Sequence, residues 1–186
     1  MTSKTKTKKL TECAVMIALA TVLSFISVYN APFGGSVTLG SMVPLVLVCA
    51  RIKDFRWAFL SCFAYALIQM MVGFAAPPTA TLGYFAAVVL LDYVVAFSAI
   101  SIANPVATLF NHTLPGVGIG AATACVLRFI CHFVGGILIW GVYAPEGQPV
   151  WLYSLLYNGG YMLPEFVITV ILSVAIYAVI SKREKK

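Results

Sequence analysis

Residues 152–180, LYSLLYNGGYMLPEFVITVILSVAIYAVI, form an apolar run with a single formal charge, Glu165. As an α-helix this run is long enough to cross the roughly 30 Å hydrocarbon core of a bilayer. The whole chain follows the same pattern, because 61% of its residues are hydrophobic and only 10% are charged. Soluble domains carry about 25% charged residues, so the composition excludes a soluble globular enzyme, a nucleic-acid binder and a disordered chain. The sequence predicts an integral membrane protein.

Basic residues predict the orientation of the chain in the membrane. Eleven of the twelve Lys and Arg fall in three clusters, at residues 4–9, 51–56 and 182–186. Since Lys and Arg accumulate on the cytoplasmic side of membrane proteins, all three clusters are expected there. We interpret them as orientation signals, with contact to anionic lipid head groups as the alternative. The net charge of +6 therefore does not indicate nucleic acid as a partner.

Apolar runs and the breakers between them predict six transmembrane helices. Glycine and proline in NAPFGGSVTLGS, residues 30–41, predict an irregular connection on the outer side, and Asn104-Pro105 is expected to end the fourth helix. A kink is expected at Pro164. Six crossings return the C-terminus to the side of the N-terminus, so we expect one all-α membrane domain over residues 1–186 with cytoplasmic termini. The predicted helices are Leu10–Tyr29, Met42–Ala50 with a few preceding residues, Trp57–Phe74, Leu82–Ala103, Val117–Gly141 and Leu152–Ile180.

The sequence lacks the common motifs of enzymatic chemistry. All five cysteines lie in apolar runs without a C-x-x-C pair, so they are interpreted as small buried hydrophobic residues. No P-loop, H-E-x-x-H or G-x-S-x-G motif occurs, so the chain is not expected to hydrolyse ATP by itself. We expect no enzymatic activity, no cofactor and no metal site.

Ionisable residues inside the predicted helices need an explanation, because a charge at membrane depth costs at least about 2.5–3.5 kcal/mol. Asp92 lies in the middle of the fourth helix, and Arg128 and His132 lie one turn apart on the fifth. One explanation is a buried ion pair between Asp92 and Arg128 that fixes the contact between the two helices. The other is that Asp92 faces a cationic ligand, while Arg128 partly balances its charge in the empty site.

Polar and aromatic residues at similar depth favour a ligand-binding pocket around Asp92. An aromatic belt at the membrane interface explains part of this set, but it does not explain the carboxylate, imidazole and amide groups beside the rings. These groups together suit a planar heteroaromatic cation. The neighbouring residues are Tyr93, His132, Trp140, Tyr153, Tyr157, Asn158 and Tyr161.

Two pairs of small residues allow close approach to a helix backbone. Gly135 and Gly136 on the fifth helix admit either a ligand or a neighbouring helix. Ala14 and Ala18 on the first helix lie four residues apart, so another helix can pack there, either within the chain or from a partner.

Four stretches of the sequence together are typical of one known family. They are GGSVTL (residues 34–39), LLDYVVAF (90–97), LRFICHFVGG (127–136) and YAPEGQPVWLYSLLYNGGYMLP (143–164). They resemble the thiamine-specific S components of energy-coupling factor (ECF) transporters, the ThiT/YuaJ family. The likeness extends over essentially the whole chain, and its last stretch is the most specific. It implies a substrate-binding subunit of the bacterial cell membrane that captures extracellular thiamine with high affinity.

The resemblance also implies which residues form the binding site. Some members have a glutamate where this chain has Asp92, and a tryptophan in the loop after the first helix, where this chain has Phe33 and glycines. By this resemblance Asp92 contacts the cationic ligand, Tyr93 lines the pocket, and His132 forms a hydrogen bond with the ligand or packs on it. The backbone at Gly136 passes close to the ligand, and Trp140 stacks on one of its rings. Tyr153 and Asn158 complete the polar contacts.

Partners are implied by the same resemblance. Members dock on a shared transmembrane T component through small residues of the first helix, a role that falls here to Ala14 and Ala18. Two cytoplasmic ATPase subunits power the module, which agrees with the missing P-loop. The alternatives are an S component for a thiamine precursor or another vitamin, a self-sufficient ion-coupled secondary transporter, and a structural membrane protein without a substrate.

Overall fold

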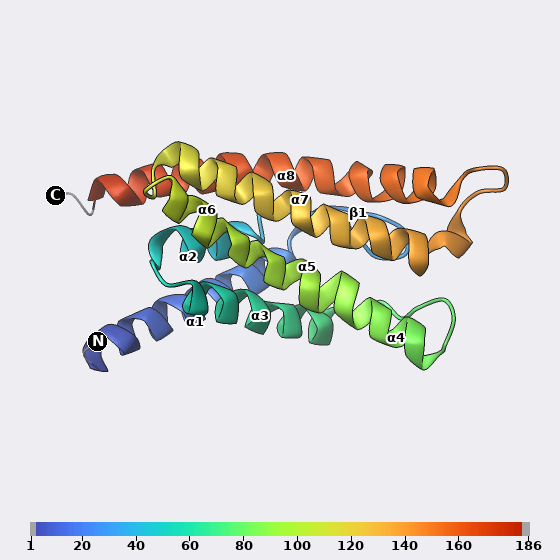
Figure 1. The fold of residues 1–186 in the computed structure, drawn as a ribbon, viewed down its shortest axis with the longest axis horizontal. Coiled ribbons are helices and arrows are strands. Elements are labelled where there is room, and N and C mark those ends of the chain that lie inside the picture. Colours follow the sequence, from blue (N-terminus) through green and yellow to red (C-terminus); the bar gives the residue numbers. More distant parts are fainter. Residues whose placement is uncertain (1–2, 184–186) are drawn as a thin grey trace.

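Helices that run side by side along one axis make up most of the structure (Figure 1). The computed structural model describes residues 3–183, so Lys185 and Lys186 lie outside the described residues, as does the side chain of Lys4. In chain order the elements are α1 (Ser3–Ser24), β1 (Ser27–Asn30), β2 (Ser36–Thr38), α2 (Val43–Arg51), α3 (Phe55–Val72), α4 (Leu82–Val88), the π-helical turn η1 (Val89–Val94), α5 (Val95–Ser98), the 3₁₀ turn η2 (Ala99–Ile102), α6 (Ala103–Leu109), α7 (Leu114–Leu138), the 3₁₀ turn η3 (Gly141–Tyr143) and α8 (Val150–Arg183).

Four helical stretches in the described part of the chain are long and apolar enough to cross a membrane. They are Phe55–Val72, Leu82–Leu109, Leu114–Leu138 and Val150–Arg183. By contrast, α2 has nine residues and a length of only about 13–14 Å, so it is too short to cross a bilayer alone. The structure is therefore that of a multi-pass membrane protein, and the count of six membrane crossings stays a prediction.

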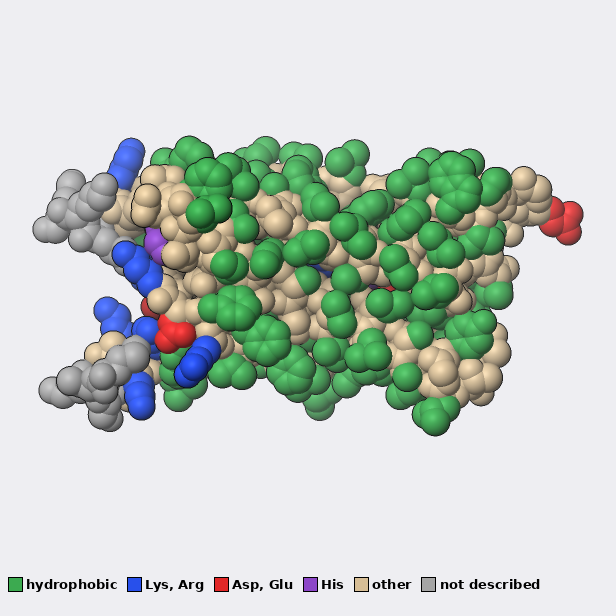
Figure 2. Space-filling view, in the orientation of Figure 1, with side chains coloured by type: hydrophobic (Ala, Val, Ile, Leu, Met, Phe, Trp, Pro, Cys, Tyr) green, Lys and Arg blue, Asp and Glu red, His purple; other side chains and the backbone are tan. Residues whose placement is uncertain are grey.

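The described members of the basic clusters gather at the end of the molecule where α1 begins and α8 ends (Figure 2). Two ion pairs join the start of α1 to the connection between α2 and α3, because Lys9 Nζ lies 3.6 Å from Asp54 Oδ2 and Arg51 Nε lies 2.5 Å from Glu12 Oε1. Hydrophobic side chains cover much of the rest of this face. This arrangement agrees with the expectation that the clusters lie on the same side of the membrane. That this side is the cytoplasmic one stays a prediction.

The first helix ends at Ser24, and the prediction that it continues to Tyr29 is wrong. The next residues form β1, which pairs antiparallel with β2, so the fold is not purely α-helical. Residues 33–35 make the turn with φ angles of +62°, +105° and +149°. Two of these three are glycines, which adopt positive φ without strain, so the irregular connection expected here is an ordered hairpin.

The fourth helical stretch continues through Pro105 to Leu109, so the prediction that Asn104-Pro105 ends it is wrong. The 3₁₀ turn η2 precedes this proline and replaces the α-helical hydrogen-bond pattern that proline cannot complete. The buried Asn104 amide instead donates hydrogen bonds of 2.8 Å to the carbonyls of Cys49 and Ile52. It thereby satisfies carbonyl groups at the end of α2, which explains how so short a helix ends inside the bundle.

The last two long helices lie close to their predicted positions. Helix α7 covers Leu114–Leu138 where Val117–Gly141 was expected, and it starts earlier because the Thr113 hydroxyl accepts a hydrogen bond from Gly116 N. Helix α8 covers Val150–Arg183 and runs without interruption through Pro164. Together α7 and α8 form the most extensive helix pair of the fold.

A buried carboxylate fastens the hairpin to α8. Glu165 is only 3% exposed, and its two oxygens accept hydrogen bonds from the backbone nitrogen of Thr38 (2.7 Å) and from its hydroxyl (2.6 Å). At Gly35 a Cβ atom would lie 2.6 Å from the Tyr161 ring, so a larger residue would push the turn away from α8. These contacts place the hairpin over the interior of the helix bundle.

Candidate ligand-binding site

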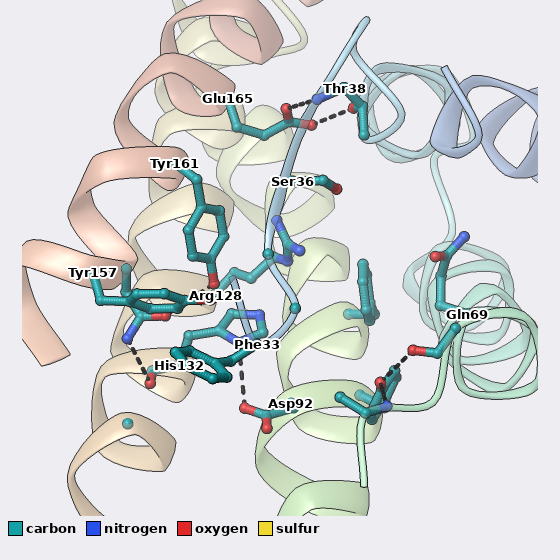
Figure 3. A pocket seen from close by; sticks show the side chains of 18 of the residues that line it. Phe33, Ser36, Thr38, Gln69, Asp92, Arg128, His132, Tyr157, Tyr161 and Glu165 are labelled. Carbon is teal, nitrogen blue, oxygen red and sulfur yellow. Dashed lines mark hydrogen bonds and ion pairs between the residues drawn. The ribbon is translucent and has the colours of Figure 1, made fainter. Parts of the chain in front are cut away.

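A cavity of about 200 Å³ lies between the hairpin, α3, η1, α7 and α8. Figure 3 shows Asp92 and His132 toward one end of it, Thr38 and Glu165 at the other, and Arg128 between them. The seven residues predicted to bind substrate all line this one cavity, although they come from three separate parts of the sequence. They are Asp92, Tyr93, His132, Gly136, Trp140, Tyr153 and Asn158.

Asp92 is positioned by the π-helical turn η1 and by two partners from α7 and its C-terminal end. Trp140 Nε1 donates a hydrogen bond of 2.9 Å to Asp92 Oδ2, and His132 Nδ1 lies 3.3 Å from Asp92 Oδ1. The Asp92 side chain is 12% exposed. Single π-helical turns often occur at functional sites, where they change the direction of a side chain. The result is a nearly buried carboxylate held at fixed orientation in the cavity wall.

The direct ion pair between Asp92 and Arg128 is not formed, so that explanation of the two charges is wrong for the described residues. Arg128 lies one turn before His132 on α7, and it is His132 that reaches Asp92. The Arg128 guanidinium instead lies over the Phe97 ring, with its carbon 4.7 Å from the ring centroid. This contact is a cation–π interaction.

Tyr93 and Asn158 line the cavity but also hold its walls together. The Tyr93 hydroxyl donates to Gly73 O (2.7 Å) and accepts from Ala75 N (2.8 Å), which fixes the connection after α3. Asn158 Nδ2 donates to His132 O (3.2 Å), so it joins α8 to α7. Both polar groups have partners inside the protein before any ligand binds.

Gly136 allows α7 and α8 to approach closely. A Cβ atom at this position would collide with Ser154 Oγ and lie 2.9 Å from Asn158 Nδ2. Of the two explanations for this glycine, close approach of a neighbouring helix is the one that the geometry supports, although the residue also lines the cavity.

Replacing Gly136 with alanine is expected to lower the free energy of unfolding by about 1–2 kcal/mol, because the added methyl group overpacks the α7–α8 contact. Thermal unfolding of the detergent-solubilised protein measures this change. Gly160→Ala is the matched control, since a Cβ atom there meets nothing within 4 Å and alanine is the better helix former. Unchanged stability of Gly136→Ala would contradict the proposed contact.

Aromatic side chains cover the end of the cavity near Asp92. Phe33 at the tip of the hairpin stacks on Tyr143 with ring centroids 4.0 Å apart, and Tyr143 lies 6.3 Å from Trp140. The Tyr157 hydroxyl donates to Pro32 O, and its ring packs 5.7 Å from that of Tyr153. The hairpin is therefore fixed over the cavity by ring contacts and a hydrogen bond.

Several residues of the cavity were not predicted from the sequence. Thr38 and Ser41 belong to a segment that was expected to be irregular, so no periodic pattern placed them inside. Phe97 lies five residues after Asp92, a spacing that matches a π-helical turn but not an α-helical one. The glycine pair at residues 34–35 was the one available signal, because it indicates a tight turn close to other backbone.

Two of the residues that line the cavity have a buried polar atom without a hydrogen-bond partner among the described residues. These atoms are His132 Nε2 and Arg128 Nε. Buried polar atoms are rarely left unpaired in proteins, and here both atoms lack a partner that the described residues could supply. In residues 3–183 no group of three or more His, Cys, Asp or Glu is placed to hold a metal ion.

Ala14 and Ala18 do not line this cavity, and both are exposed on α1. Their neighbours Cys13 and Ala20 are buried against the rest of the protein instead. Packing within the chain therefore does not explain the pair of exposed alanines.

The family profile described as thiamine transporter protein (Thia_YuaJ) matches residues 10–185. The chain belongs to the Thia_YuaJ family. The thiamine transporter ThiT of Bacillus subtilis (strain 168) is 34% identical over 184 residues, covering 88% of this chain and 86% of the relative. ThiT of Lacticaseibacillus paracasei is 32% identical over 91 residues, covering 44% and 45% of the two chains.

A solved structure of ThiT from Listeria monocytogenes has a TM-score of 0.75 and 25% sequence identity to this chain. The match covers 96% of this chain and 97% of that structure, so the fold is shared over nearly the full length. These findings confirm the resemblance to the ThiT/YuaJ family that was drawn from the sequence. As a member of the Thia_YuaJ family, the chain is a multi-pass transporter of the cell membrane and not an enzyme.

Proposed function

We propose that the chain binds thiamine with high affinity at the cavity around Asp92. The observation that carries the proposal is a nearly buried carboxylate with an indole N–H and an imidazole as its partners. A carboxylate in this setting attracts a planar cation, and Trp140 offers a ring on which it can stack. Thiamine has a cationic thiazolium ring of this kind, and the named relatives are thiamine transporters.

The cavity is proposed to receive thiamine from outside the cell. Its aromatic cover comes from the hairpin and from the loop around Tyr143, away from the basic clusters that are expected on the cytoplasmic side. The chain would act as the S component of an ECF transporter, with a transmembrane T component and two cytoplasmic ATPase subunits as partners. The exposed pair Ala14 and Ala18 is the proposed contact with the T component.

A thiamine titration of the purified chain in detergent, followed by tryptophan fluorescence, tests the proposal. Trp140 should report binding directly, because its indole N–H already contacts the proposed ligand-binding carboxylate. We expect saturable quenching at sub-micromolar thiamine without any partner subunit, and its loss in Trp140→Phe. No response of the folded protein up to millimolar thiamine would contradict thiamine as the substrate, and other vitamins and thiamine precursors would be titrated next.

A further inference from the structure

The buried face of α8 is polar along most of its length. Its buried residues are Ser154, Asn158, Tyr161, Met162, Glu165, Thr169 and Ser173. Asn158, Tyr161 and Glu165 line the ligand cavity, which explains why they are polar. Thr169 and Ser173 do not line it, because they lie beyond Glu165 toward the end of α8 that carries the basic residues (Figure 1). Two polar side chains inside this part of the bundle need another explanation.

The hydroxyl groups of Thr169 and Ser173 have no hydrogen-bond partner among the described residues. Both side chains are fully buried, with an exposed fraction of 0%. Hydroxyls on other helices of this chain donate to a carbonyl one turn earlier, as Ser61 does to Trp57 O at 2.8 Å. Thr169 and Ser173 do not form this bond. Burying an unpaired hydroxyl costs free energy, so these two groups call for a partner from outside the chain.

The spacing along α8 fits one water molecule per turn. Four polar residues on this side of the helix are separated by four positions each, namely Glu165, Thr169, Ser173 and Tyr177. Each therefore lies about 6 Å along the helix axis from the next, and a water with two hydrogen bonds of about 2.8 Å spans that distance. Each Glu165 oxygen accepts one hydrogen bond and can accept another. At the other end, the Tyr177 hydroxyl donates to His112 O at 3.0 Å.

Helix α7 faces this segment of α8 with small side chains. The Cys125 thiol approaches the Thr169 hydroxyl, but a thiol is a weak donor and a weak acceptor. One turn further along α7, Ala121 is fully buried, and a Cβ atom at Gly118 would lie 3.2 Å from the Val174 side chain. These residues offer no strong hydrogen-bonding side chain to α8. A partner for the two hydroxyls must therefore be small and able both to donate and to accept.

We propose that ordered water molecules bind Thr169 and Ser173 and continue the polar line of α8 from Glu165 toward Tyr177. Buried waters in proteins typically satisfy polar groups that have no other partner. The line covers about 18 Å of helix and reaches the cavity at the end where Glu165 lies (Figure 3). It gives this end of the cavity a hydrated connection toward the basic end of the molecule that bypasses the hairpin. The inference goes beyond the proposed function and does not depend on thiamine.

A crystal structure of the full chain, at a resolution that shows ordered water, tests the site directly. We expect a water within hydrogen-bonding distance of both Thr169 Oγ1 and Ser173 Oγ. Both hydroxyls bonded to the carbonyls one turn earlier, with no water beside them, would overturn the proposal. Because this measurement uses the wild type, it decides even if the variants below do not fold.

Thermal unfolding in detergent gives an independent test. Thr169→Val keeps the shape of the side chain, and it should lower the unfolding midpoint by about 2–4 °C because the bound water loses a partner. An unpaired, dry hydroxyl predicts the opposite, since its removal is favourable, so an unchanged or raised midpoint would contradict the water site. Thr21→Val is the matched control and should leave the midpoint nearly unchanged, because the Thr21 hydroxyl bonds to its own helix at Ile17 O.

A double variant tests whether the two hydroxyls share one water. If they do, either single substitution disrupts it, and Thr169→Val combined with Ser173→Ala should lower the midpoint by less than the sum of the two single changes. Strictly additive losses would show that the two hydroxyls act separately and would exclude the continuous line of water.

Discussion

Replacing Asp92 with asparagine is expected to weaken thiamine binding by about 1.5–3 kcal/mol, the range for hydrogen bonds and contacts of charged groups. Asparagine keeps the shape of the side chain and one oxygen that can accept the 2.9 Å hydrogen bond from Trp140 Nε1. It removes the negative charge that is proposed to face the thiazolium ring. The affinity should therefore fall about 10- to 150-fold, while the fold is retained.

Isothermal titration calorimetry measures the affinity of Asp92→Asn, and circular dichroism checks that the helical content is unchanged. Asp54→Asn is the matched control. It makes the same chemical change at the start of α3, where the side chain accepts a hydrogen bond from Arg56 N and asparagine is an equally good helix cap. Wild-type affinity in Asp92→Asn would exclude the pairing of this carboxylate with the ligand cation.

Asp92 also shows why the composition of the cavity could be predicted from the sequence. Exposing an ionisable side chain to the hydrocarbon core of the membrane costs free energy. This cost by itself predicts that Asp92 and His132 face the protein interior. Helical periodicity then put Trp140 near the same face of the fifth helix as His132. The structure brings these three side chains together through a hydrogen bond and a short polar contact. Their role in thiamine binding stays a prediction.

The hairpin shows where local patterns fail. Ser27–Asn30 is too short to give a clear strand signal, and its partner strand lies beyond a glycine turn. What holds the hairpin in place is Glu165, which lies 127 residues from Thr38 in the sequence. A contact over such a distance leaves no trace in the spacing of either residue. The sequence alone therefore could not show that this acid is a structural group.

The short helix α2 shows a second limit of prediction from the sequence. Its residues 43–50 are all buried, and its carbonyl end is satisfied by Asn104 from α6. An apolar run of this length is equally consistent with part of a membrane-crossing helix or with a buried core helix. Only the tertiary structure distinguishes the two.

Replacing Ala14 or Ala18 with tryptophan is expected to leave thiamine binding intact and to lower thiamine uptake at least about tenfold. Both alanines are exposed on α1, so a larger side chain does not disturb the packing of the chain itself. Small residues four apart allow a partner helix to approach closely, and overpacking such a contact costs about 1–3 kcal/mol. If the T component docks here, the complex that transports thiamine is weakened while the free subunit keeps its cavity.

Two measurements on the same variants separate docking from folding. Calorimetry gives the thiamine affinity of each purified variant, and uptake of radiolabelled thiamine is measured in vesicles that contain the T component and both ATPase subunits. Ala175→Trp is the matched control, because Ala175 is an exposed alanine on α8, a helix that is long and apolar enough to cross a membrane. Equal loss of uptake in the control would show that tryptophan on any exposed helix face is harmful. Loss of thiamine binding by the Ala14 and Ala18 variants would mean that this face of α1 supports the fold. Loss of uptake confined to Ala14→Trp and Ala18→Trp is the result that docking requires, because it separates the surface that binds the partner from the cavity that binds the ligand.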